Sequence, residues 1–126
     1  MISFFVQGEA RAKQSFRVGA HGRGFQTARV KAWQADVGWA GQQAMRDAGI
    51  QEPLTCTLQV ELRFNLSTNR RIDADNLSKG CLDGLNHICW ADDRQIMVLI
   101  IRKFVTGKED CGVRITIDDL CEENLP

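Results

Sequence analysis

The sequence has few of the residues that mark extended, linker-like or membrane-spanning chains. Only two of its 126 residues are proline, and it contains no low-complexity tract, which excludes collagen-like and linker sequences. No apolar run approaches the roughly 18 residues that a membrane-spanning helix needs. The first residues, MISFFVQGEARAK, lack the basic segment and the long apolar stretch of a secretory signal. We therefore expect one cytoplasmic domain over residues 1–126 with no membrane partner.

Cysteine is present, but never in the close pairs that zinc sites and thioredoxin-like chemistry use. The five cysteines are Cys56, Cys81, Cys89, Cys111 and Cys121. An odd count without CxxC spacing predicts neither a zinc site nor a disulfide framework. We expect these thiols to be reduced and structural.

Net charge is also absent, because sixteen basic residues balance sixteen acidic ones. The two signs are separated along the chain: between Ala10 and Ala35 there are six basic residues and no acid. Binding of a polyanion depends on the local field rather than on the sum, so this segment is a candidate nucleic-acid contact. The alternative is a solvated loop and helix face.

Hydrophobic spacing predicts an α+β fold of two layers. Helical spacing follows Thr27 and stops at Gly49, and a second helix begins at Asp73 or Asp75. Strict alternation over 54–64 predicts a half-buried strand, and the run 96–105, apolar on both faces, predicts a central one. With strands at 2–6 and 113–117 and a long loop over 8–26, the order is β-α-β-α-β-β, a mixed sheet packed by two helices.

Acidic residues gather before the second helix and before the apolar strand. Asp73 and Asp75 stand at the helix start, and Asp92 and Asp93 precede the strand. We expect the packed helix to return its N-terminus to the start of that strand, so that these carboxylates meet. Carboxylates a few ångströms apart repel by about 4 kcal/mol per pair near a surface, and a hard divalent cation, Mg²⁺ or Mn²⁺, would offset this repulsion. Lys79, one turn after Asp75, could neutralise residual charge or contact a phosphate oxygen.

A simpler interpretation of the same residues stays open at this point. Asp73 or Asp75 could be a helix N-cap, and Lys79 and Asp83 could form a surface pair.

The wider pattern favours the metal site. Asp73-x-Asp75-Asn76-Leu77-x-Lys79, the helix end Asp83-Gly84-Leu85-Asn86, then Trp90-x-Asp92-Asp93 and the later Lys103 resemble the RusA-type Holliday junction resolvases. The resemblance implies a homodimeric, magnesium-dependent endodeoxyribonuclease that cuts four-way DNA junctions by paired symmetrical nicks. It also implies that Asp73, Asp75 and Asp93 are the catalytic, metal-holding carboxylates and that Lys79 is the catalytic lysine.

The stretch from Gly8 to Arg17 is similar to the basic loop of that family, although it lacks the family's prolines. We expect the DNA contacts to come from basic residues of this loop and from two that flank the acidic motif. They are Arg11, Lys13, Arg17, Arg23, Arg71 and Lys103.

Two questions stay open from the sequence alone. The active unit should be a two-fold homodimer, because a junction offers two equivalent strands, but either Trp39 on the first helix or the last strands could form the interface. Two other functions also remain: a non-catalytic DNA-junction-binding module, and a small metal-dependent nuclease acting on other branched or single-stranded DNA.

Overall fold

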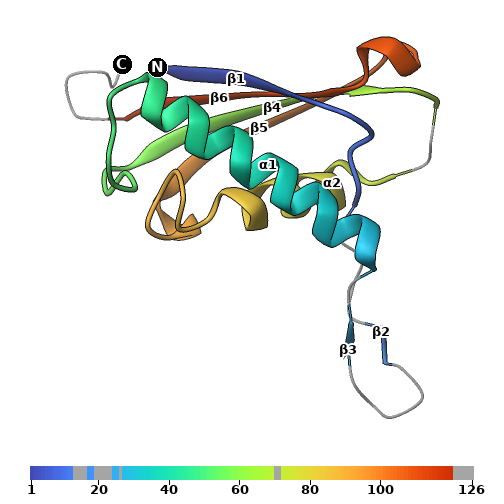
Figure 1. Cartoon of the computed structure of the whole chain (residues 1–126), viewed down its shortest axis with the longest axis horizontal. Helices are drawn as coiled ribbons and strands as arrows, with labels where there is room; N and C mark the ends of the chain where they lie inside the picture. Colours follow the sequence, from blue (N-terminus) through green and yellow to red (C-terminus); the bar gives the residue numbers. More distant parts are fainter. Residues whose placement is uncertain (13–16, 19–23, 26, 70–71, 121–126) are drawn as a thin grey trace.

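The computed structural model describes residues 1–12, 17–18, 24–25, 27–69 and 72–120, with the backbone alone for 17–18 and 24–25. A four-stranded sheet forms one layer and two helices form the other (Figure 1). The elements in chain order are β1 (Ile2–Gln7), β2 (Arg17–Val18), β3 (Gly24–Phe25), α1 (Ala28–Asp47), β4 (Leu58–Leu66), α2 (Ala74–Leu85), the 3₁₀ turn η1 (Asp93–Gln95), β5 (Ile96–Val105), the 3₁₀ turn η2 (Lys108–Asp110) and β6 (Gly112–Asp119).

The sheet is mixed, as the sequence predicts, with strand order β1-β6-β4-β5. β6 lies antiparallel to both β1 and β4, whereas β5 lies parallel to β4. The short strands β2 and β3 pair with each other, within the segment expected to be a loop. No described helix is both long and apolar enough to cross a bilayer.

Helix α1 follows the predicted pattern closely. The Thr27 side chain accepts a hydrogen bond from the Val30 backbone N–H at 3.3 Å, which caps the first turn. At the other end Gly49 adopts φ +75°, a left-handed conformation that favours glycine and ends the helix. Trp33 and Val37 point into the core, as predicted for the apolar stripe.

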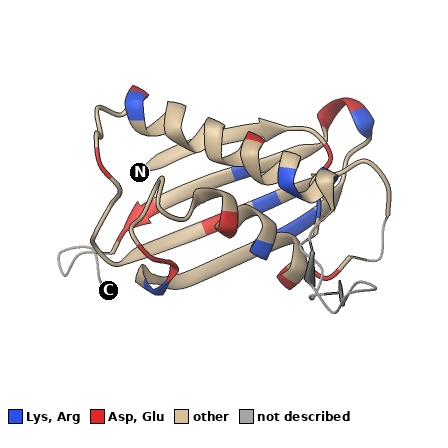
Figure 2. Ribbon diagram, turned by 60° about the horizontal axis from the view of Figure 1, so that its bottom comes forward, with Lys and Arg blue, Asp and Glu red and all other residues tan. Residues whose placement is uncertain are grey.

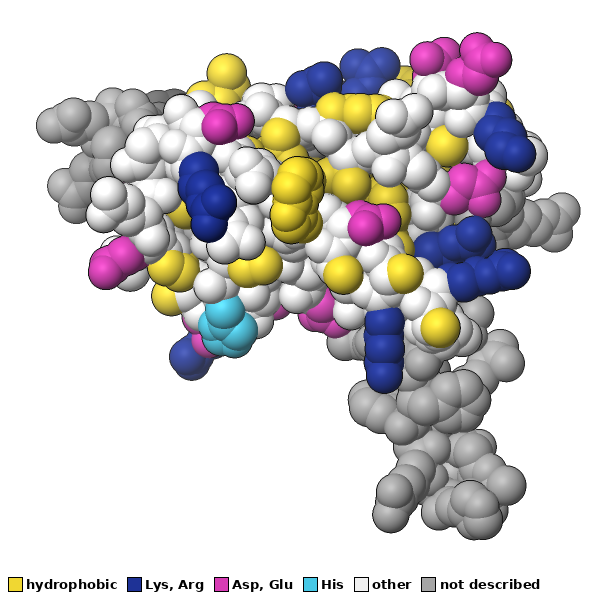
Figure 3. Space-filling model, in the orientation of Figure 1, with side chains coloured by type: hydrophobic (Ala, Val, Ile, Leu, Met, Phe, Trp, Pro, Cys, Tyr) yellow, Lys and Arg dark blue, Asp and Glu magenta, His cyan; other side chains and the backbone are white. Residues whose placement is uncertain are grey.

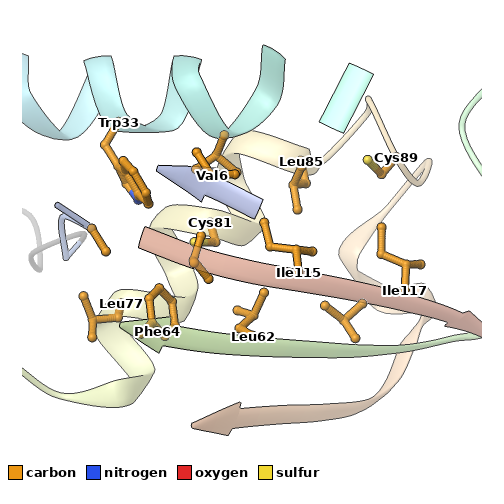
Figure 4. Close-up of a cluster of buried hydrophobic side chains, with 14 of the residues drawn as sticks. Val6, Trp33, Leu62, Phe64, Leu77, Cys81, Leu85, Cys89, Ile115 and Ile117 are labelled. Atoms are coloured by element: carbon orange, nitrogen blue, oxygen red, sulfur yellow. The ribbon is translucent and has the colours of Figure 1, made fainter. Parts of the chain in front are cut away.

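Both helices lie on the same face of the sheet and meet each other at glycines. A Cβ on Gly84 would come within 2.7 Å of the Gln34 carbonyl oxygen of α1, and one on Gly38 within 2.8 Å of the Gly84 carbonyl oxygen. The missing side chains therefore let the two backbones approach closely. Beneath this contact, side chains of α1, α2 and alternate residues of the strands form the core (Figure 4).

The cysteines in this core behave as expected for structural thiols. Cys81 and Cys89 are fully buried and are free thiols. Burial raises the pKa of each to about 12, so both are neutral and unreactive near pH 7. Cys56 is only partly buried, and Cys121 lies outside the described residues.

The apolar strand 96–105 has the predicted ends but not the predicted place. β5 lies at the edge of the sheet, paired only with β4 among the described strands, so the expectation of a central strand was wrong. An apolar run on both faces indicates two covered faces, but not whether the cover belongs to the same chain. Here several of its large apolar side chains remain exposed: Met97, Val98, Leu99, Phe104 and Val105. Strand 54–64 also begins later than predicted, at Leu58.

Candidate active site

The first acidic residue of the motif stands at the start of α2. Asp73 occupies the N-cap position with extended backbone angles, yet its side chain makes no capping hydrogen bond to the first turn. The simpler interpretation, in which this carboxylate caps the helix, therefore fails for Asp73. Asp73 is exposed and lies beside the positive end of the helix.

Asp75 and Lys79 lie one turn apart on the exposed side of the same helix. The Lys79 Nζ atom lies 3.2 Å from the Asp75 Oδ2 atom, an i,i+4 ion pair whose side chains are 54% and 75% exposed. A pair this exposed contributes only about 0.3–0.5 kcal/mol to stability. The pair therefore adds little to folding, and both charged groups stay accessible to a substrate.

Lys103 connects the end of β5 to the start of α2. Its Nζ donates a hydrogen bond to the Ile72 carbonyl oxygen at 2.9 Å, immediately before Asp73. The sequence suggested Lys103 as a DNA contact. The structure gives it a positioning contact, because the bond holds the residue that precedes the acidic motif.

Asp93 is held at the opposite end of α2. The indole N–H of the fully buried Trp90 donates to the Asp93 Oδ1 atom at 2.7 Å. This contact fixes one carboxylate oxygen and leaves the second one out of that hydrogen bond. Sequence reasoning gave Trp90 no role, although its place three residues before Asp93 was the available signal.

The carboxylate of the neighbouring Asp92 is engaged by the residues that directly follow it. Its side chain accepts from the Arg94 backbone N–H at 2.8 Å and lies 3.2 Å from the Arg94 Nε, while the Gln95 side chain accepts from the Asp92 backbone. The backbone hydrogen bond, followed by the Arg94 side chain, holds the pKa of Asp92 below its usual range. Both Asp92 oxygens thus contact Arg94, whereas one Asp93 oxygen stays outside the hydrogen bond with Trp90. Asp93 is therefore the better candidate of the two for a ligand, a choice that the sequence left to motif position.

The two acidic groups do not meet within one chain. The loop after α2 closes on itself, because the His87 backbone N–H donates to the Trp90 carbonyl at 2.8 Å. Asp93 therefore lies near the C-terminus of α2 and the start of β5. Asp73 and Asp75 lie near the N-terminus of α2 and the end of β5. Twelve residues separate these ends by about 18 Å of helix. Figure 2 shows acidic residues at both ends of this helix.

The expectation that α2 returns its N-terminus to the start of β5 was therefore wrong. Among the described residues, which include all four of these aspartates, no three acidic, histidine or cysteine side chains are grouped so that they could hold a metal ion. One protomer presents two separate parts: Asp73, Asp75 and Lys79 at one end of α2, and Asp93 at the other.

The predicted basic DNA contacts are only partly described. Lys13, Arg23 and Arg71 lie outside the described residues, and for Arg17 the structure gives only the backbone of β2. Arg11 is described, and its Nη2 atom lies 3.6 Å from the Glu9 Oε2 atom, with both side chains about one-third exposed. These contacts stay predictions.

A family model described as "Endodeoxyribonuclease RusA" covers residues 6–118, which include every acidic residue and lysine of the motif. No curated protein matches the chain.

Proposed function

Because this chain belongs to the RusA endodeoxyribonuclease family, we propose that it resolves four-way DNA junctions by paired, magnesium-dependent nicks and that its active unit is a homodimer. The observation that carries this proposal is the exposed group at the start of α2. Asp73 and Asp75 present carboxylates two residues apart, with Lys79 beside Asp75, inside the matched region. Neither carboxylate is needed to cap the helix.

These residues fit a divalent cation in part. Carboxylate oxygens are the ligands that Mg²⁺ and Mn²⁺ prefer, and Asp73 and Asp75 could supply two of them. A cation held there would polarise the scissile phosphate and help generate hydroxide from water. Lys79 would neutralise charge that develops on a phosphate oxygen. The third carboxylate of the motif, Asp93, is too far away in the same chain to complete this set.

A second copy of the chain would bring the missing carboxylate. β5 is a ten-residue edge strand with large exposed apolar side chains, an arrangement that monomeric proteins avoid because it invites pairing with another strand. Met97 is 67% exposed and Val105 57% exposed. Pairing β5 with the same strand of a second copy would cover this edge.

The symmetry of such a pair determines which ends meet. Identical strands related by a two-fold axis across the sheet pair antiparallel, so the start of one β5 lies beside the end of the other. Asp93 precedes the start of β5, and Lys103 holds Ile72 near its end. Antiparallel pairing thus directs Asp93 of each copy toward Asp73 and Asp75 of the other, and the dimer gains two complete carboxylate groups.

Charged substitutions on β5 should separate the two copies. In Met97→Lys/Leu99→Lys we expect the mass in solution to fall from about twice the 14.2 kDa chain mass to a single chain mass, with junction cleavage lost. Light scattering and a cleavage assay measure both effects. The matched comparison is Trp39→Lys on α1, where the side chain is 66% exposed. Monomers from Trp39→Lys and dimers from the β5 variant would place the interface on α1 instead.

The activity itself is tested with labelled four-way, forked, duplex and single-stranded DNA, each with and without Mg²⁺. We expect paired nicks in the four-way junction only, and only with the metal. Binding without cleavage would indicate a non-catalytic junction-binding module. Cleavage of forked or single-stranded DNA at an equal rate would indicate a less specific metal-dependent nuclease.

A further inference from the structure

The face of the sheet that the helices leave open carries a row of arginines. Arg63 in the centre of β4 lies in register with Arg102 on β5 and with Arg114 on β6. Residues in register across neighbouring strands point to the same face, and the buried neighbours of Arg63, Leu62 and Phe64, point to the helix side. We call Arg102, Arg63 and Arg114 the arginine row; basic residues on neighbouring strands of the sheet are visible in Figure 2.

This arrangement is unfavourable for folding alone. Like charges directly opposite one another destabilise a strand pair. Here three arginines lie side by side on three neighbouring strands. Among the described residues, one of the three is offset by an acid: the Arg102 Nε atom lies 3.1 Å from the Glu61 Oε1 atom. In the part of the chain that the structure describes, neither Arg63 nor Arg114 has a carboxylate partner at ion-pair distance.

Aromatic rings hold the two unpaired guanidinium groups in place. The Arg63 Cζ atom lies 4.3 Å from the centre of the Phe104 ring, and the Arg114 Cζ atom lies 5.6 Å from the centre of the Phe5 ring. Stacking on a ring limits the motion of the side chain without using its N–H donors. The Arg114 Nη1 atom donates a long hydrogen bond to the Ser3 Oγ atom at 3.5 Å, and the other N–H donors of the two guanidinium groups stay available for an anion.

The shape of the row favours a polymer over a small anion. Strands lie about 4.8 Å apart, so three arginines in register extend over about 10 Å of open sheet, a span nearer to the width of the major groove of DNA, about 12 Å, than to that of the minor groove, about 6 Å. A second copy of this chain is a poor occupant, because face-to-face contact would oppose arginine rows of the same charge. On the α1 side of the molecule, in contrast, basic and acidic side chains are interspersed (Figure 3).

We infer that the arginine row binds the sugar–phosphate backbone of a double-stranded arm of the DNA substrate. The inference rests on the proposed function for the identity of the DNA. Along β5, Arg102 on the open face directly precedes Lys103, which contacts Ile72 before Asp73. An arm that crosses the end of β5 would therefore meet the row close to the acidic motif.

The test measures affinity for a blunt duplex and for a four-way junction between about 50 and 200 mM salt, without divalent metal. Each lost phosphate contact should lower the slope of log K against log salt by about 0.9, so we expect Arg63→Gln/Arg114→Gln to lower it by about 1.8 for the duplex. Arg63→Lys keeps the charge and should keep the slope. Arg46→Gln, in the last turn of α1, is the matched control and should leave slope and affinity unchanged.

An unchanged slope in the folded double variant overturns the inference, even if affinity falls, because a lost phosphate contact must reduce counterion release. A parallel cleavage assay separates this outcome from failure of the proposed function. If the unmodified protein cuts no junction while the double variant lowers the duplex slope by about 1.8, the inference about the arginine row is supported and the proposed function is contradicted. If the protein cuts junctions and the double variant keeps the slope of the unmodified protein, the proposed function is supported and the inference about the arginine row is contradicted.

Discussion

Asp75→Asn should reduce junction cleavage by about 1,000-fold or more and leave junction binding intact. The substitution keeps the size of the side chain and removes the charge that a cation needs. Losing that stabilisation of the transition state, roughly 4 kcal/mol, corresponds to a loss of this size. Asp75 is exposed, and its side chain makes a weak ion pair with Lys79, so the fold should be unaffected.

The matched control is Asp83→Asn. Asp83 lies two turns later on the exposed side of the same helix and carries the same charge, but at a distance from Asp73. Cleavage and gel-shift assays at one Mg²⁺ concentration compare the two variants. Near-normal nicking by Asp75→Asn, or an equal loss in both variants, would contradict the assignment of Asp75 to the metal.

Local structure was predictable because neighbouring residues determine it. The Thr27 cap, the apolar stripe of α1 and the Asp75–Lys79 pair all follow from spacings of three or four residues. The limits of β5 followed from its composition in the same way. The mixed α+β layers followed from the order of these elements.

The assembly of the site was not predictable, because it depends on how a short loop turns. The connection after α2 could have run back along the helix toward its N-terminus. That course would have brought Asp93 close to Asp73 and Asp75, as the predicted grouping of carboxylates required. Instead the loop closes through the His87–Trp90 hydrogen bond, with His87 at φ +69°, and β5 starts beside the end of α2. No periodicity in the sequence indicates that turn.

The place of β5 in the sheet was hidden for a related reason. Apolar residues such as Met97 and Val98 are expected in the core when a single chain is considered, but they are exposed in the structure. The same pattern is expected for a strand that a second copy covers. The arginine row escaped detection because Arg63, Arg102 and Arg114 are far apart in sequence and meet only through strand register.

The most direct test of a site shared by two copies is complementation between Asp75→Asn and Asp93→Asn. Each variant alone forms dimers in which both sites lack a carboxylate, so each should be inactive. In a mixed dimer, one site receives both substitutions and the other receives neither. Random mixing makes about half of the dimers mixed, so an equal mixture should regain about one-quarter of the unmodified nicking sites.

The expected products also differ in kind. Mixed dimers hold one intact site, so a four-way junction should be nicked in one strand rather than in a symmetrical pair. Labelled junctions incubated with each variant and with the co-refolded mixture show both the amount and the pairing of nicks. Recovered single-strand nicking is the result that the shared site predicts. A mixture that contains mixed dimers yet stays as inactive as either variant alone would contradict it.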